Sequence, residues 1–287
     1  MDVVLSIAAR SWTGPFAPQT CERALDALEA GKLLVFAELR FALTSGEHTL
    51  LTPALLGGAK NVCLDPSGRL KHASGGNDAP LMNLMERFAC AGTVLVENLL
   101  PAYRGRIDRA RTSFRPAEIE GRRSSPLKDD TRLHVDAFPA TPMRGRRILR
   151  LFANINPTEP RVWCVGEPFE AMAAKLLPGL RVPPRAFDWL LAGIGATKGL
   201  RSRYDDLMLG LHNRAKTDDG YRRDCPRQRL EFAAGTVWLC YTDQVMHAAL
   251  KGQHALEQTF HVPVEAMAHP ERAPLRVLER LAGRRLV

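Results

Sequence analysis

A series of short strand patterns, divided by a helical stretch, constrains the fold more than any other feature of the chain. Runs rich in β-branched and aromatic residues predict strands at residues 112–119, 132–138, 148–156, 229–232 and 236–241. Helical periodicity separates the last two of these strands from the first three, at residues 167–177, 186–194 and 204–214. Short strands with such an insert favour an α+β protein with a double-stranded β-helix core, the jelly-roll form that is also found in cupins.

The N-terminal part of the chain has a mixed pattern. It predicts a helix at residues 20–32, a strand at 33–36 and further helix at 81–101, where a proline ends it. We expect one domain over residues 1–287, made of a mixed region at 1–105, a jelly-roll core at 106–265 with a helical insert at 167–216, and a C-terminal helix at 266–287.

One predicted strand, at residues 132–138, carries a histidine and an aspartate separated by a single residue. Successive side chains of a strand point to opposite faces, so His134 and Asp136 are expected to project together. The pair alone is weak, because a chain with 8 histidines and 31 acidic residues contains roughly one such match by chance. A second histidine would complete the two-histidine, one-carboxylate set that holds Fe(II) in non-haem oxygenases. A simple hydrogen bond between the two side chains is the alternative.

His247 is the candidate for the third metal ligand, because it follows the last predicted strand directly. His254 and His261 lie in the same stretch and remain alternatives. His212 falls in a helical pattern and is expected at the surface rather than in a site.

The net charge of the chain is +9, which indicates an anionic partner such as a nucleic acid, an acidic membrane surface or a phosphorylated substrate. Aromatic residues make up only 7% and no basic and aromatic strand pattern recurs, so we expect no nucleic-acid partner. No window reaches the ~18 apolar residues of a membrane span. The six cysteines lack zinc-like spacing, and together with the absence of a leader pattern this favours reduced thiols in the cytosol.

Eight sequence motifs follow one another in an order that carries a family resemblance. They are KN at 60–61, LLPAY at 99–103, RTSFRP at 111–116, KDDTRLHVDAF at 128–138, RLFANINP at 150–157, RVW at 161–163, VGEPF at 165–169 and DQVMH at 243–247. This order resembles the Kdo hydroxylase family. Members of that family are Fe(II)- and 2-oxoglutarate-dependent dioxygenases that act on the 3-deoxy-D-manno-oct-2-ulosonic acid (Kdo) sugar of Gram-negative lipopolysaccharide.

The resemblance implies an enzyme that hydroxylates the Kdo sugar of Kdo-lipid A at carbon 3, giving the Ko sugar, with Fe(II), 2-oxoglutarate and O2. His134, Asp136 and His247 would then be the metal ligands and catalytic residues. Two imidazoles and one carboxylate leave three positions on an octahedral iron, of which the 2-oxo acid chelates two and oxygen takes the third.

The far carboxylate of 2-oxoglutarate needs a cationic anchor. Oxygenases of this fold commonly place an arginine soon after the distal histidine, but here that region reads Glu257-Gln258. We therefore predict that Arg150, on the strand after the His-x-Asp pair and in phase with Asn154, binds the cosubstrate together with Asn154. A surface arginine on an edge strand is the alternative for Arg150.

A Kdo unit on a lipid A precursor carries carboxylates and phosphates, so we expect arginines to bind it. Arg115 and Arg132 are predicted to bind the sugar, because Arg132 shares a face with His134 and Arg115 lies on the first predicted strand. The C-terminal run has leucines and arginines that suit an anionic membrane surface, although a helix packed on the barrel is the alternative. The expected location is the cytoplasm, peripheral on the inner face of the inner membrane.

Two other functions remain open from the sequence. One is a 2-oxoglutarate oxygenase that hydroxylates a protein side chain or another small molecule. The other is a basic β-barrel that binds anions or nucleic acid without catalysis. Trp163 and Trp238 are expected to be core aromatics rather than ligand platforms.

Overall fold

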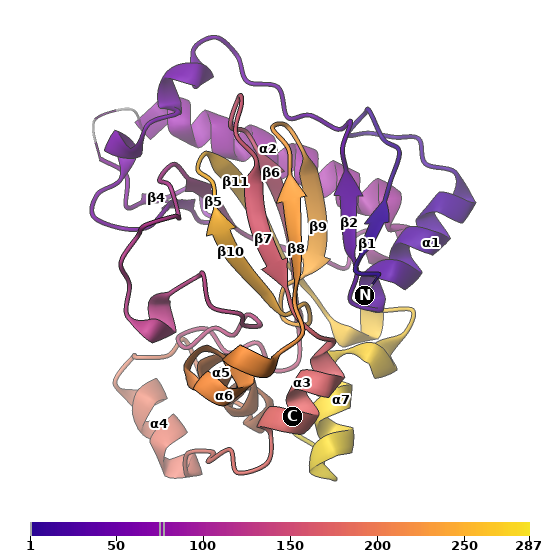
Figure 1. Cartoon of the computed structure of the whole chain (residues 1–287), viewed down its shortest axis with the longest axis vertical. Coiled ribbons are helices and arrows are strands. Elements are labelled where there is room, and N and C mark those ends of the chain that lie inside the picture. The colour runs from indigo at the N-terminus through magenta and orange to yellow at the C-terminus, as the bar shows by residue number, and fades with distance from the viewer. Residues whose placement is uncertain (1, 75, 77) are drawn as a thin grey trace.

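Two β-sheets face each other in the computed structural model, which describes residues 2–74, 76 and 78–287 (Figure 1). The eight-stranded sheet runs in the order β1 (Val4–Ser6), β2 (Leu33–Phe36), β9 (Val237–Tyr241), β6 (Arg147–Asn154), β11 (Ala255–Val262), β5 (Asp108–Arg115), β3 (Val62–Leu64) and β4 (Leu70–Lys71). The three-stranded sheet runs β10 (His247–Lys251), β7 (Arg161–Val165) and β8 (Gln228–Phe232). The α+β prediction with a jelly-roll core is confirmed.

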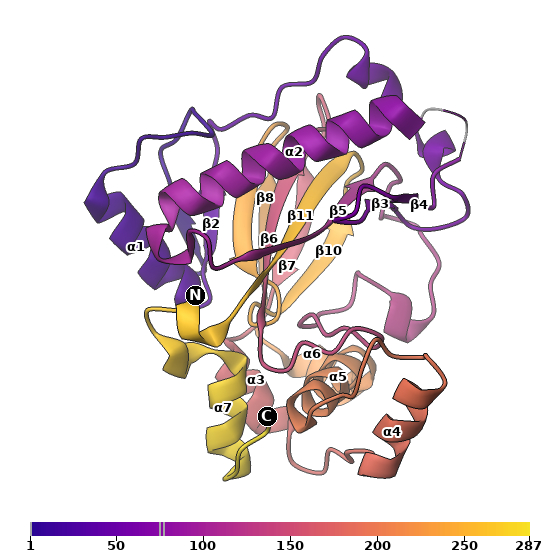
Figure 2. The same ribbon diagram turned by 180° about the vertical axis from the view of Figure 1, so that it is seen from behind.

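The helices cover the outer face of the larger sheet and one end of the two sheets (Figures 1 and 2). The N-terminal helices are α1 (Pro18–Glu29) and α2 (Asp78–Leu99). The helices at the end of the sheets are α3 (Phe169–Leu176), α4 (Arg185–Gly193), α5 (Arg203–Thr217), α6 (Asp219–Asp224) and α7 (Pro274–Ala282). No helix in the described ranges is long and apolar enough to cross a membrane.

Strand β6 is buried along its whole length, because it has a core on each side. Leu149 and Leu151 belong to the cluster that includes the apolar face of α2. Gly92 of α2 allows a close approach, since a Cβ at that position would lie 2.7 Å from Cδ2 of Leu151. The other face of β6 turns Phe152 toward the smaller sheet. Trp238 stacks on Phe152 with ring centroids 5.1 Å apart, so the prediction that Trp238 is a core residue is confirmed.

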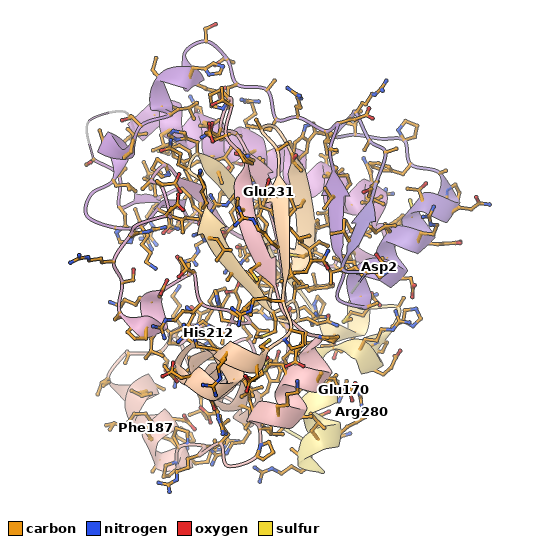
Figure 3. All side chains as sticks on the ribbon, in the orientation of Figure 1. Asp2, Glu170, Phe187, His212, Glu231 and Arg280 are labelled. Atoms are coloured by element: carbon orange, nitrogen blue, oxygen red, sulfur yellow. The ribbon has the colours of Figure 1, made fainter. Side chains whose placement is uncertain are left out.

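The C-terminal helix α7 packs on the body of the protein. Leu275 and Leu278 are buried in a cluster shared with α3 and α5. Arg280 forms an ion pair with Glu170 of α3 at 3.2 Å, and Figure 3 shows these two side chains together. The apolar face of α7 is therefore used inside the protein, which agrees with the alternative that places this helix on the barrel.

The predicted strand at residues 132–138 is wrong as a regular strand. The backbone of His134 pairs with that of His247 in an isolated antiparallel bridge. Two residues later, the N–H of Asp136 donates to the carbonyl of Thr242 at 2.7 Å. Thr242 follows β9 of the larger sheet and His247 begins β10 of the smaller one, so the segment changes partner between sheets and cannot continue one ladder.

Several elements were not predicted from the sequence. They are β1, β3, β4, β7, β10, β11 and α6. Strands β1 to β4, all from residues 1–105, extend the larger sheet. The strand predicted at 112–119 instead spans Asp108–Arg115, because the chain pairs there with β11 and β3.

A buried ion pair holds the turn between β9 and His247. Arg147 and Asp243 are 0% and 1% exposed, and Nε of the arginine lies 2.8 Å from Oδ2 of the aspartate. Arg147 also donates to Oε1 of Gln244 at 2.6 Å, and its guanidinium lies over the ring of Tyr241 at 3.8 Å. The turn that leads into His247 is therefore held to β6 by charge as well as by packing.

Asp243→Ala is expected to lower the free energy of unfolding by about 3–5 kcal/mol, because it leaves the Arg147 charge buried without its partner. The measurement is urea denaturation of the metal-free protein. Asp108→Ala is the matched control, since it removes the exposed Arg146 partner at 3.0 Å and should cost at most about 1 kcal/mol. Equal losses for the two variants would contradict the role given to the buried pair.

Candidate metal centre

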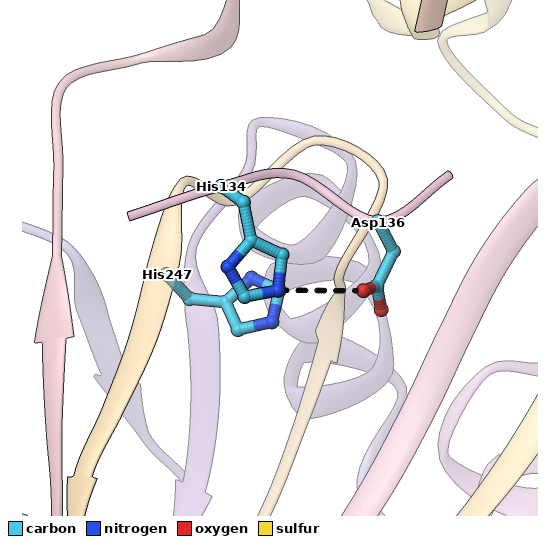
Figure 4. Close-up of side chains that lie close together, drawn as sticks. All are labelled: His134, Asp136 and His247. Atoms are coloured by element: carbon cyan, nitrogen blue, oxygen red, sulfur yellow. Dashed lines mark ion pairs between the residues drawn. The ribbon is translucent and has the colours of Figure 1, made fainter. Parts of the chain in front are cut away.

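Two histidines and one aspartate meet where the segment 132–138 pairs with the start of β10 (Figure 4). One ligand atom from each of His134, Asp136 and His247 lies within 4.8 Å of the others. Nε2 of His134 is 3.8 Å from Oδ1 of Asp136. The structure therefore brings the three predicted ligands together. Both histidines are buried, so the site is screened from water.

Backbone carbonyls orient both imidazole rings. Nδ1 of His134 lies 2.8 Å from the carbonyl of Arg132, and Nδ1 of His247 lies 2.9 Å from that of Val245. A carbonyl only accepts hydrogen bonds, so each Nδ1 carries the proton and each Nε2 keeps its lone pair. Two Nε2 atoms are thus available to one cation, an orientation typical of metal-ligating histidines.

The protonation states also suit a metal. Burial, together with the neighbouring His247, holds the pKa of His134 well below its ordinary value, and burial lowers the pKa of His247. Burial opposes ionisation of Asp136, but Arg150 and the two histidines outweigh it and hold its pKa well below the usual range. At neutral pH the site therefore presents two neutral imidazoles and a carboxylate, which are the forms that bind a metal.

The donor set fits Fe(II). Oδ2 of Asp136 is buried and accepts no well-formed hydrogen bond from a described residue, although Nη2 of Arg150 lies 3.1 Å away. The carboxylate is thus ionised beside Arg150, and an oxygen that accepts no well-formed hydrogen bond keeps a lone pair for a metal ion. Two imidazoles and one carboxylate on one side of a site are typical of non-haem iron centres with open positions.

A group of arginines lies beside these ligands. Arg150, on the central strand β6, is 6% exposed, so the alternative of a surface arginine on an edge strand is wrong. Its Nη1 donates to Oε1 of Glu257 at 2.9 Å, while Nη2 of Arg115 donates to Oε2 of the same residue at 2.6 Å. Burial opposes ionisation of Glu257, but the arginines hold its pKa down at about 2. Burial and the neighbouring Arg115 lower the pKa of Arg161 to about 9.

Arg115, Arg150 and Arg161 carry more positive charge than Glu257 and Asp136, the two carboxylates paired with this group, can balance. Nε of Arg150, Nε of Arg161 and Nε1 of Trp163 are buried without hydrogen-bond partners among the described residues. Unpaired buried donors of this kind indicate a place for an anion with several acceptor oxygens. A dicarboxylate that reaches from the metal ligands to Arg150 has this chemistry.

The remaining predicted binding residues lie in different surroundings. The amide nitrogen of Asn154 donates to the carbonyls of Glu159, Phe232 and Ala233, so it joins loops rather than pointing at the three ligands. Arg132 is a quarter exposed, with Nε 3.3 Å from Oδ2 of Asp129, and it also donates to the carbonyl of Lys216.

The prediction that His212 lies at the surface is wrong. Its ring, on α5, lies 5.0 Å from that of His134 in an edge-on arrangement, and Nδ1 lies 2.7 Å from the carbonyl of Val135. Burial lowers the pKa of His212, so it is a neutral imidazole beside the centre. A helical pattern says which face is apolar but not which element the other face meets, and for this reason the sequence did not reveal the contact.

Trp163 is buried as predicted, but it is also part of the site. Its ring stacks on His247 at 5.1 Å and 23°. The sequence signal for this role was the RVW motif. Its Arg161 and Trp163 are two residues apart and therefore share one face of β7. The antiparallel pairing of Val165 with His247 then places Trp163 diagonally across from the histidine.

The two alternative histidines do not join the metal group in the described structure. His254 lies in the turn between β10 and β11, with a positive φ of 54°. His261 lies in β11 opposite Asp108 and Ile148. The position of His247 at the start of β10 thus distinguishes it from both.

The chain is similar to solved structures of a Kdo hydroxylase, KdoO. The cobalt(II) complex is 45% identical with a TM-score of 0.97, and the match covers 99% of this chain and 97% of that chain. The complex with alphaketoglutarate and Fe(III) is 44% identical with a TM-score of 0.95, at the same coverage. The apo structure is 44% identical with a TM-score of 0.96, again over 99% and 97% of the two chains. No curated protein sequence matches the chain.

A jelly-roll core that holds two histidines and a carboxylate at one end of its sheets defines a non-haem Fe(II) dioxygenase dependent on a 2-oxo acid, and the protein is an enzyme of this class. The model of the 3-deoxy-D-manno-oct-2-ulosonic acid (Kdo) hydroxylase family matches residues 11–285. The chain belongs to the Kdo hydroxylase family. The alternative of a binding module without catalysis is therefore wrong.

The lowered histidine pKa values predict a metal affinity that resists mild acid. Two histidines with an ordinary pKa of about 6.5 would cost Co(II) affinity about 14-fold between about pH 7.5 and about pH 6, because both must lose a proton to bind. Since the pKa values of His134 and His247 are lowered, both stay neutral until the pH falls through those lower values. We therefore expect a loss clearly smaller than about 14-fold over this interval. Co(II) absorption titrations at the two pH values check this, and a loss near 14-fold would contradict it.

Proposed function

We propose that the protein hydroxylates the Kdo sugar of a lipid A precursor at carbon 3, converting it to the Ko sugar, with Fe(II), 2-oxoglutarate and O2. The observation that carries this proposal is the meeting of His134, Asp136 and His247 beside an arginine group with unpaired donors. The membership of the family supports the choice of sugar. The lipid-linked acceptor would place the enzyme in the cytoplasm, at the inner face of the inner membrane.

The three ligands would hold the metal through Nε2 of His134, Nε2 of His247 and the carboxylate of Asp136. The carbonyls of Arg132 and Val245 keep both rings in the required tautomer. When bound, the iron couples oxidative decarboxylation of 2-oxoglutarate to activation of O2. The protein positions the bound groups and excludes water, because the site is buried. No general base is needed at the attacked carbon.

The arginine group would bind 2-oxoglutarate. Arg150 is the anchor for the far carboxylate, and Arg161 and Trp163 supply further donors whose hydrogen-bonding capacity is unused. Glu257 holds Arg150 and Arg115 in place by accepting from both. Asn154 would support this binding indirectly, by fixing the loops at the end of β6.

The sugar carboxylate would bind at the more open side of the site. Arg132 is the candidate, because it lies two residues before the ligand His134 and is partly exposed. Arg115 is also partly exposed and lies between the cosubstrate group and solvent, so it is suited to contact either anion.

Turnover of Kdo-lipid A by the wild-type protein, with Fe(II) and 2-oxoglutarate, should give a product heavier by one oxygen atom, and peptide substrates should not react. His134→Ala, Asp136→Ala and His247→Ala should each lose stoichiometric Fe(II) and turnover while remaining folded, because they remove a ligand and not core packing. His261→Ala is the matched control and should keep both. Product mass and bound iron are measured. Retained iron and turnover in His247→Ala would contradict the ligand assignment.

Arg150→Ala should raise the apparent 2-oxoglutarate constant by at least ~100-fold, since a buried charge-assisted pair is worth several kcal/mol and each ~1.4 is tenfold. Steady-state kinetics with varied 2-oxoglutarate measures this. Arg161→Ala should also raise the constant, because its unpaired Nε lies in the same group. Arg146→Ala, at a partly exposed position where the side chain pairs with Asp108, is the control and should leave it unchanged. An unchanged constant for Arg150→Ala would move the anchor to Arg115 or Arg161.

A further inference from the structure

Helix α4 has its polarity reversed relative to an ordinary surface helix. Its buried residue is Asp188, which is 1% exposed. Phe187, Trp189 and Leu190 are 44%, 66% and 56% exposed, and Ile194 just after the helix is 68% exposed. A surface helix normally turns its apolar side to the core, so an apolar side that faces outward marks a candidate interaction site.

Polar contacts hold α4 to the rest of the protein. Arg185 donates to the carbonyl of Arg201 at 3.0 Å, and Arg203 donates to the carbonyl of Pro183, just before the helix. The large apolar side chains of α4 are therefore not needed to attach it. Figures 1 and 2 place α4 at the end of the molecule opposite α2, and Figure 3 shows Phe187 at that end.

A hollow of about 490 Å³ rich in arginine lies next to α4. The residues that line it include Arg144, Arg185, Arg201, Arg203 and Arg285, and no acidic residue among those described. Most of the hydrogen bonds that these guanidinium groups make go to backbone carbonyls, which carry no net charge. Arg203 also pairs with Asp206, at 3.3 Å. The hollow thus keeps a positive charge that an anion can balance.

We propose that α4 and this hollow form a surface that docks onto a bilayer carrying phosphate groups. The aromatic and aliphatic side chains of α4 would enter the interface, where tryptophan is favoured, while the arginines of the hollow bind lipid phosphates. This proposal rests on the proposed function in one respect, since a lipid-linked acceptor gives the surface its purpose.

The charge of this surface favours a bilayer over another copy of the chain. Two copies that met through this face would bring arginines against arginines, whereas lipid phosphates neutralise them. The C-terminal helix offers no comparable surface, because Leu275 and Leu278 are buried and Leu281 is 38% exposed. The apolar side chains of α4 and the arginines of the hollow lie on adjoining elements. Together they combine the apolar and basic groups that one interfacial helix carries.

Trp189 supplies a direct probe of docking. The other tryptophans are Trp12, which is half-buried, and Trp163 and Trp238, which are 2% and 0% exposed. Vesicles of phosphatidylcholine with phosphatidylglycerol should sediment the full-length protein and shift its tryptophan emission to the blue, and high salt should weaken both effects. Trp189→Phe should keep sedimentation but lose most of the shift, because it retains an apolar ring and removes the reporter.

Paired variants separate the two parts of the surface. Trp189→Ser with Leu190→Ser should weaken vesicle binding at least ~10-fold, while Val94→Ser on α2 and Leu281→Ser on α7 should leave it within about twofold. Arg185→Glu with Arg285→Glu should also weaken it at least ~10-fold, and Arg69→Glu, in the turn between β3 and β4, should not. Equal binding to pure phosphatidylcholine would overturn the role of the arginines. Unchanged vesicle binding by the Trp189 and Leu190 double variant would overturn the docking surface. The same holds if the wild-type protein is a dimer and the double variant loses dimerisation while its vesicle binding is unchanged.

Two further measurements keep this inference distinct from the proposed function. Co(II) binding verifies that each variant is folded, because the substitutions lie away from the metal ligands. Hydroxylation of a water-soluble Kdo acceptor should be unchanged in the α4 variants. Normal turnover without vesicle binding by the wild-type protein would overturn the docking surface alone, whereas vesicle binding without turnover on any Kdo acceptor would overturn the proposed function alone.

Discussion

The metal centre depends on two backbone hydrogen bonds between His134 and His247, at 3.0 and 2.8 Å. They join an irregular segment to the first residue of β10, so the two imidazoles are placed by main-chain geometry rather than by flexible side chains. The next contact of that segment, from Asp136 to Thr242 just after β9, sets the third ligand. A site held by main-chain hydrogen bonds in this way is preorganised for metal binding.

The buried charges around this centre do not balance one another without bound ligands. Glu257 is buried and Asp136 is largely buried, both are ionised, and Arg150 contacts both. Arg161 adds a charge that burial disfavours strongly enough to lower its pKa to about 9. An uncompensated buried charge costs several kcal/mol, so a metal and an anion that balance these charges are expected to stabilise the folded protein.

The helices at the end of the sheets show how similar sequence patterns take different roles. In α7 the leucines enter the core and Arg280 pairs with α3, whereas in α4 the apolar residues face outward and the aspartate is buried. Helix α5 turns His212 toward the metal centre from the same end. Periodicity describes each helix alone, and only its neighbours decide which side is covered.

Local rules were sufficient for much of the protein. The strand at residues 33–36, the helices of the insert and the fold class followed from periodicity and turn residues, and the order of motifs indicated the family and three ligand positions. Contacts between distant segments were not accessible in this way. The pairing of β7 with β10 set Trp163 on His247, the pairing of β5 and β6 with β11 gathered Arg115 and Arg150 on Glu257, and the change of sheet at His134 broke a predicted strand. The sequence by itself indicated the family and the three candidate metal ligands, while the tertiary structure decided which other residues meet them, because strand pairing depends on the whole sheet and not on any one segment.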